Sequence, residues 1–182
     1  MRYLIALVCT GLLSSAAMAQ TAEDTLEKYL QVLTGEDLSG IATLMDSSSM
    51  DNLKKSIDKS IQHQASFNDT TLQRRIFGKE VPMSDVAAAS AGFYLKALAS
   101  EILQAARLQH LKVTDREIIG KIQETENLVH IVVRLNMAQN ESRGSDILVY
   151  TLVRENDQWK LQFPPTIKQM LLVIESTARQ RR

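Results

Sequence analysis

The spacing of the apolar residues changes near residue 113, and this change constrains the fold more than any other feature of the sequence. Before that point, apolar residues recur every three or four positions, which is the period of an amphipathic helix. After it, they alternate with polar residues, which is the period of a half-buried strand. We therefore expect an α+β fold in which N-terminal helices pack on a sheet built from the second half of the chain.

The first half contains five stretches with helical spacing. The first begins at Thr21, where Asp24 completes a capping box, and ends at Gly35. The other stretches cover about residues 38–45, 50–61, 69–77 and 84–109. The last of them begins at Ser84, a good N-cap, and its apolar stripe is continuous to the end. We expect it to form one long helix that is the spine of the domain.

The second half contains four stretches with strand spacing, at about residues 116–123, 127–137, 145–154 and 158–163. Short polar turns separate them, so consecutive strands must pair antiparallel and form a curved meander. Pro164 and Pro165 then end the sheet. A C-terminal amphipathic helix is predicted over residues 165–178, followed by a basic tail at residues 179–182, for which we favour a solvated terminus.

The sequence predicts which residues of the sheet face the helices more clearly for the second strand than for the third. In the second strand Val129, Ile131 and Val133 alternate with a set that includes His130, Arg134 and Asn136, so we expect the three apolar residues to face the helices. The third strand is apolar on both faces. We assign the following residues to an apolar patch on the outer face: Leu128, Val132, Leu148, Tyr150 and Leu152. Such patches are seldom left uncovered, which predicts either the C-terminal helix or a second copy, in a homodimer, over this sheet face.

The first 19 residues, MRYLIALVCTGLLSSAAMA, have the pattern of a secretory signal peptide: a basic start, an apolar run and small residues before the cleavage point. We predict cleavage after Ala19 and a single domain over residues 20–182. The apolar run is too short to cross a bilayer, and no transmembrane segment is expected in the mature chain. The predicted location is periplasmic or secreted.

Composition excludes several classes of function. Basic and acidic residues number 21 each, so the formal net charge is zero, whereas a nucleic-acid-binding protein would carry a clustered positive excess. Cys9, in the predicted signal peptide, is the single cysteine, which leaves the mature chain without a disulfide or thiolate metal site. His63 and His110 lack metal-ligand spacing, and the glycines form no phosphate-binding loop. We predict no cofactor and no metal.

The stretch LVYTLVRENDQWKLQFPP, residues 148–165, combines a hairpin with a polar turn, then Trp159, then a strand that ends at proline. It resembles the NTF2-like superfamily of cone-shaped α+β domains, and the resemblance covers about residues 21–163. The resemblance implies a pocket for a small apolar ligand between the long helix and the sheet. The pocket residues expected on this basis are Tyr94, Leu98, Ile131, Val133, Trp159 and Phe163. The alternative is that these six residues simply fill the core.

The NTF2-like fold hosts enzymes as well as binding modules, so two functions follow from the resemblance. We favour an exported, non-enzymatic binding or interaction module. The alternative is a small lyase or isomerase that uses His130 as general base, with Arg134 or Tyr150 beside it. Because His130 and Arg134 alternate with the apolar face of their strand, the sequence favours a position on the outer face, at the rim of an interface.

Overall fold

The computed structural model of the chain describes residues 20–35 and 37–180, and the side chains of residues 20–35 and 37–177. The predicted signal peptide, residues 1–19, and the side chains of the basic tail, residues 179–182, lie outside the described residues.

The described residues form an α+β fold, as the change in apolar spacing predicts. In chain order the elements are α1 (Ala22–Thr34), a 3-10 helix η1 (Ile41–Leu44), α2 (Ser47–Ala65), α3 (Thr71–Phe77), α4 (Met83–Ala88), α5 (Ala91–Leu108), β1 (Leu111–Thr125), β2 (Leu128–Gln139), β3 (Ser142–Glu155), β4 (Gln158–Leu161) and α6 (Pro165–Gln180). The capping box at Thr21 and Asp24 is present and starts α1.

The four strands pair antiparallel in the order β1-β2-β3-β4, which confirms the predicted meander. The first three strands are longer than predicted. Leu111 pairs with Gln139 and Ser142 pairs with Gln139 on the other side, so backbone pairing extends the sheet beyond the clearly alternating residues. Three register shifts interrupt the pairing of β1 with β2, and such irregularities bend and twist a sheet.

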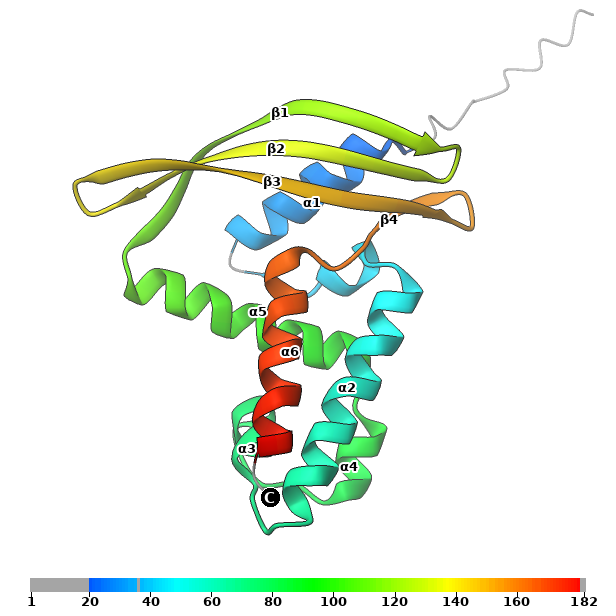
Figure 1. Ribbon diagram of the computed structural model, residues 1–182, viewed down its shortest axis with the longest axis vertical. Helices are drawn as coiled ribbons and strands as arrows, with labels where there is room; N and C mark the ends of the chain where they lie inside the picture. The colour runs from blue at the N-terminus through cyan, green and yellow to red at the C-terminus, as the bar shows by residue number, and fades with distance from the viewer. Residues whose placement is uncertain (1–19, 36, 181–182) are drawn as a thin grey trace, which may run out of the picture.

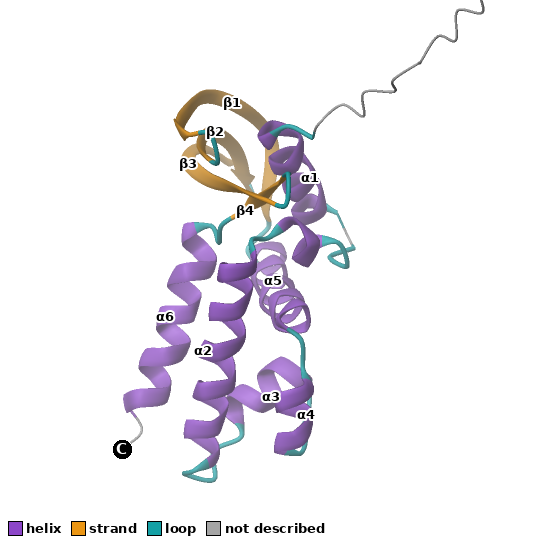
Figure 2. Cartoon of the chain, turned by 90° about the vertical axis from the view of Figure 1, so that its right-hand side faces the viewer, coloured by secondary structure: helices purple, strands orange, loops and turns teal. Residues whose placement is uncertain are grey.

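The bent sheet curls over α1, and α5 crosses below them (Figures 1 and 2). From this layer, α2 and α6 run side by side away from the sheet, with α3 and α4 at their far end. We call α2, α3, α4 and α6 the helical stem. The predicted C-terminal helix therefore exists, but it packs on α2 and leaves the outer face of the sheet uncovered.

The expected long helix over residues 84–109 is wrong, because the chain breaks into α4 and α5 at Ala89 and Ser90. Ala89 is extended, and Ser90 is the N-cap of α5, with its Oγ accepting a hydrogen bond from the Phe93 N–H at 3.1 Å. Lys54 of α2 donates to the carbonyls of Ala87 and Ala89, at 3.1 and 2.9 Å. Contacts from α2, which is distant in the sequence, thus stabilise the break between α4 and α5. The alanine-rich sequence around it does not predict this break.

Two other helical boundaries differ from the prediction. The stretch at 38–45 forms only the 3-10 helix η1, because Asp46 already caps the next helix through a hydrogen bond from the Ser49 N–H at 3.0 Å. As a consequence α2 begins at Ser47, earlier than the predicted start at Met50, and continues to Ala65.

The face assigned to β3 is also wrong, and the register of the sheet shows why. Leu148 pairs with Val133, Tyr150 with Ile131, and Leu152 with Val129, and directly paired residues lie on the same face. The residues predicted for an outer patch, Leu148, Tyr150 and Leu152, therefore face the helices, and Tyr150 and Leu152 are buried. In their place, Ile147 and Val149 lie on the outer face.

The inner face of β2 is as predicted, with Val129, Ile131 and Val133 completely buried. They belong to a hydrophobic core that continues from the sheet through α1 and α5 into the helical stem. Among the described residues, no helix has the length and apolar character needed to cross a membrane.

Candidate binding site

A cavity of about 170 Å³ lies between the inner face of the sheet and the helices below it. Helices α1, η1 and α5 form three walls, strands β2 and β3 form the roof, and the start of α6 closes one side. The lining residues are Tyr29, Leu33, Ile41, Met45, Leu95, Ala99, Ile102, Leu135, Leu148, Tyr150, Pro164, Pro165, Thr166 and Ile167. Because nearly all of these side chains are apolar, the cavity suits an apolar molecule.

Tyr29, Tyr150 and Thr166 bring hydroxyl groups into this lining, and the two tyrosines lie close together. Their rings meet edge to face, with centroids 6.0 Å apart, and both side chains are buried. Neither hydroxyl forms a hydrogen bond with another described residue. By contrast, the hydroxyl of Tyr94 lies 2.6 Å from Asp58 Oδ1 and 3.0 Å from the Val86 carbonyl. Because a tyrosine hydroxyl can both donate and accept, these two hydroxyls can form hydrogen bonds with a bound molecule.

Both cavity hydroxyls carry their proton at neutral pH. Burial, with a smaller effect of Asp146, raises the pKa of Tyr150 to about 12. Burial also raises the pKa of Tyr29 far above its usual value, and the neighbouring Tyr150 adds to this effect. Each hydroxyl can therefore donate one hydrogen bond to an acceptor atom inside the cavity and accept another.

None of the six residues expected to line a ligand pocket is among the lining residues of this cavity. Tyr94, Leu98, Ile131 and Val133 are completely or almost completely buried in the core. Phe163 is buried as well, and Trp159 packs partly buried against the core. The lining comes instead from other positions, among them Ala99 of α5. No signal in the alanine-rich sequence of this helix distinguishes Ala99 from the other small apolar residues.

The three residues proposed for catalysis do not come together. His130 lies on the outer face of the sheet, with Nε2 2.7 Å from Glu124 Oε2 and Nδ1 3.0 Å from Thr151 Oγ1. Arg134 is on the same face and donates to Glu117 at 2.8 Å. Tyr150 faces the cavity on the opposite side of the sheet.

Within the part of the chain that the structure describes, no group of three or more His, Cys, Asp or Glu side chains is placed to hold a metal ion. The chain matches no protein-family model, and a comparison with curated proteins finds no match either. The function is therefore inferred from the geometry of the cavity and of the molecular surface.

Proposed function

We propose that this protein is a binding module that holds a small, mainly apolar molecule in the cavity between the sheet and α1, η1 and α5. The proposal includes membership of the NTF2-like superfamily, whose cone-shaped domains enclose a pocket of this kind. A bent antiparallel meander with helices in its hollow supports that assignment, although the helical stem extends well beyond such a cone.

One observation carries the proposal: the apolar cavity is lined by two buried tyrosine residues whose hydroxyls form no hydrogen bond with any described residue. The volume, about 170 Å³, is similar to engineered cavities of roughly 150 Å³ that bind benzene. A ligand with an aromatic or short aliphatic body and one polar atom would fill the space and satisfy a hydroxyl.

The geometry supports binding better than catalysis by His130. The imidazole of His130 is on the outer face, separated from the cavity by the sheet itself. A molecule enclosed in the cavity has no route to this imidazole, so a general base at His130 would act on a different ligand at the exposed surface.

Filling the cavity tests the proposal. In Ala99→Leu the added carbon atoms occupy the space from the α5 side, so the variant should lose binding of phenol as measured by isothermal titration calorimetry. Ala105→Leu makes the same change at an exposed position of α5 and should bind phenol like the unaltered protein. Absence of phenol and toluene binding in the unaltered protein, or equal binding in both variants, would contradict the proposal.

We also propose that the protein is exported to the periplasm or secreted, with its leader removed after Ala19. The capping box that starts α1 uses Thr21 and Asp24, so cleavage at this point leaves the first described helix complete. N-terminal sequencing of protein from the native host should begin at Gln20. A sequence that begins at Met1 would reject the signal peptide.

A homodimer through the outer face of the sheet is the second proposal for an interaction. Ile122, Ile147 and Val149 are 62%, 56% and 48% exposed there. His130 and Arg134 of β2 lie on the same face and already form pairs within the chain, with Glu124 and Glu117. A second copy would therefore meet apolar side chains next to charges that are already balanced.

Sedimentation velocity tests the dimer. Val149→Lys places a charge in the centre of the outer face and should convert a dimer to a monomer. Leu172→Lys, at another exposed apolar residue on α6, should leave the dimer intact. A protein that sediments as a monomer at every concentration, or a dimer broken only by the α6 change, would reject this interface.

A further inference from the structure

A second hollow of about 390 Å³ adjoins the cavity, and Leu33 lines both. It lies where the C-terminal ends of α1 and α5 meet the start of β1, on the left side of Figure 1. The residues around it are Leu33, Thr34, Gly35, Leu103, Ala106, Arg107, Leu111, Lys112 and Val113. Its floor is thus apolar like the cavity, but two cationic side chains stand at its edge.

Arg107 and Lys112 bring two positive charges to the lining of this hollow. Five other arginines form ion pairs: Arg74, Arg75, Arg116, Arg134 and Arg154. Arg107 and Lys112 form no ion pair with any described residue. They come from different elements, the last turn of α5 and the start of β1, and both side chains are exposed. Two unneutralised cations beside an apolar hollow are complementary to an anion attached to an apolar chain.

We infer that the ligand is a single-chain amphiphile with an anionic head group, such as a fatty acid. Its apolar chain occupies the cavity under the sheet and passes Leu33 into the second hollow. Its head group is held at the edge by Arg107 and Lys112. Together the two spaces reach the volume range of small-molecule sites, about 300–1,000 Å³, whereas the cavity alone falls short of it.

This inference rests on the proposed binding function and adds the chemical class of the ligand. Each part of the ligand then has a counterpart in the structure. Transfer of the ligand's apolar chain from water to the apolar lining strengthens binding. The affinity should rise by about fourfold for each buried methylene group. The anionic head gains charge-assisted hydrogen bonds from the guanidinium of Arg107 and the ammonium of Lys112.

Three probes with the same chain and different heads test the inference: decanoate, 1-decanol and decyltrimethylammonium, all measured by calorimetry below their aggregation concentrations. The unaltered protein should bind decanoate most tightly and the cation most weakly, and octanoate more weakly than decanoate. In Arg107→Gln/Lys112→Gln the affinity for decanoate should fall by about tenfold or more, while that for decanol stays the same.

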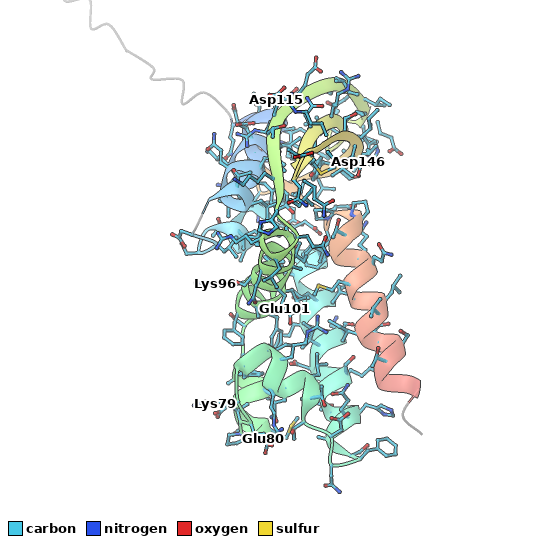
Figure 3. The ribbon with its side chains drawn as sticks, turned by 90° about the vertical axis from the view of Figure 1, so that its left-hand side faces the viewer. Lys79, Glu80, Lys96, Glu101, Asp115 and Asp146 are labelled. Atoms are coloured by element: carbon cyan, nitrogen blue, oxygen red, sulfur yellow. The ribbon has the colours of Figure 1, made fainter. Side chains whose placement is uncertain are left out.

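Lys59→Gln/Lys79→Gln is the matched control, because it removes two positive charges from exposed positions elsewhere. Lys79 lies at the end of the molecule opposite the sheet (Figure 3), and Lys59 is in α2, a helix that contributes no residue to either hollow. This variant should bind decanoate like the unaltered protein.

Equal affinity for decanoate and decanol, or an equal loss in both double variants, would overturn the inference. Binding of phenol without binding of decanoate would also overturn it, and in that case the cavity proposal survives. Failure to bind any of these molecules would instead reject the binding function itself, so the two failures are distinguishable.

Discussion

Three buried tyrosines have different roles, because one stabilises the fold and two line the cavity. Tyr94 of α5 joins three helices, because its hydroxyl contacts Asp58 of α2 and the Val86 carbonyl of α4. Tyr29 and Tyr150 are also buried, but their hydroxyls open into the cavity without a partner among the described residues. The same chemical group therefore has a structural role at one position and is available to a ligand at two others.

Replacing each tyrosine by phenylalanine should separate these roles. Tyr94→Phe should lower the free energy of unfolding by about 1–3 kcal/mol, since it removes a bond to a carboxylate, and urea titration measures this loss. Tyr29→Phe and Tyr150→Phe should change stability by less than about 0.5 kcal/mol. They should instead weaken phenol binding by about two- to tenfold and leave toluene binding unchanged. Loss of stability in all three variants would show that the cavity hydroxyls have protein partners after all.

At the scale of whole elements, the helices are held in place by contacts between segments far apart in the sequence. The break between α4 and α5 depends on Ser90 within the chain and on Lys54 from α2. Helix α1 is attached to β1 by two ion pairs, Glu27 with Arg116 and Glu23 with Lys121. The walls of the cavity are therefore fixed by polar contacts at their edges as well as by the core.

Ser90→Ala tests the start of α5. The change removes the acceptor for the Phe93 N–H, and we expect a loss of about 1 kcal/mol in the free energy of unfolding. Ser100→Ala, at an exposed position inside the same helix, should be neutral or slightly stabilising because alanine has the higher helix propensity. If the two variants lose the same amount, the cap at Ser90 does not stabilise the break.

The attachment of α1 to β1 should respond to acid. The hydrogen bond from Lys121 at 2.7 Å lowers the pKa of Glu23 below its usual 4.5. The folded state therefore keeps Glu23 ionised where the unfolded chain takes up a proton. The stabilisation is complete above about pH 4.5 and is lost as the pH falls through the lowered pKa of the folded state.

Urea titrations at pH 7 and pH 3 should show this effect as a smaller decline in Glu23→Gln than in the unaltered protein. The difference should not exceed about 1 kcal/mol, because the pair is partly exposed and screened by solvent. Glu126→Gln, which changes an exposed carboxylate without an ion pair to any described residue, should retain the full decline. A Glu23 variant with the same acid sensitivity as the unaltered protein would remove this pair from the acid response.

At the scale of the whole molecule, the sheet layer and the helical stem share one hydrophobic core. Leu53 and Ile57 of α2 belong to the same cluster as Val129 and Ile131 of β2, and α5 contacts both α2 and β1. A continuous core of this kind favours cooperative unfolding, because loss of the stem exposes apolar surface under the sheet.

We therefore expect one unfolding transition for both parts. Trp159, the single tryptophan of the chain, is in β4 and its fluorescence reports on the sheet, whereas circular dichroism at 222 nm is dominated by the helices. The two signals should give the same urea midpoint. Separate midpoints would show that the stem unfolds independently, and Ile57→Ala should then shift only the helical signal.

Much of this architecture can be predicted from the sequence because it depends on neighbouring residues. The alternation around Val129, Ile131 and Val133 predicts a strand and its buried face, and Thr21 with Asp24 predicts the start of α1. The position of the cavity could not be predicted. Every member of an apolar stripe looks alike along the sequence, and only the packing of α1 and α5 against the sheet leaves space at Ala99 while burying Tyr94 and Leu98.

The sequence by itself determined the change from helices to strands, the meander and the inner face of β2, since local periods and short turns specify them. Only the tertiary structure decided which face of β3 is inner, because Ile147 and Val149 are as apolar as Leu148 and Tyr150. The pairing of Tyr150 with Ile131 turns one set toward the helices. That register depends on residues far apart in the chain, and it places a tyrosine hydroxyl in the cavity and leaves isoleucine and valine on the outer surface.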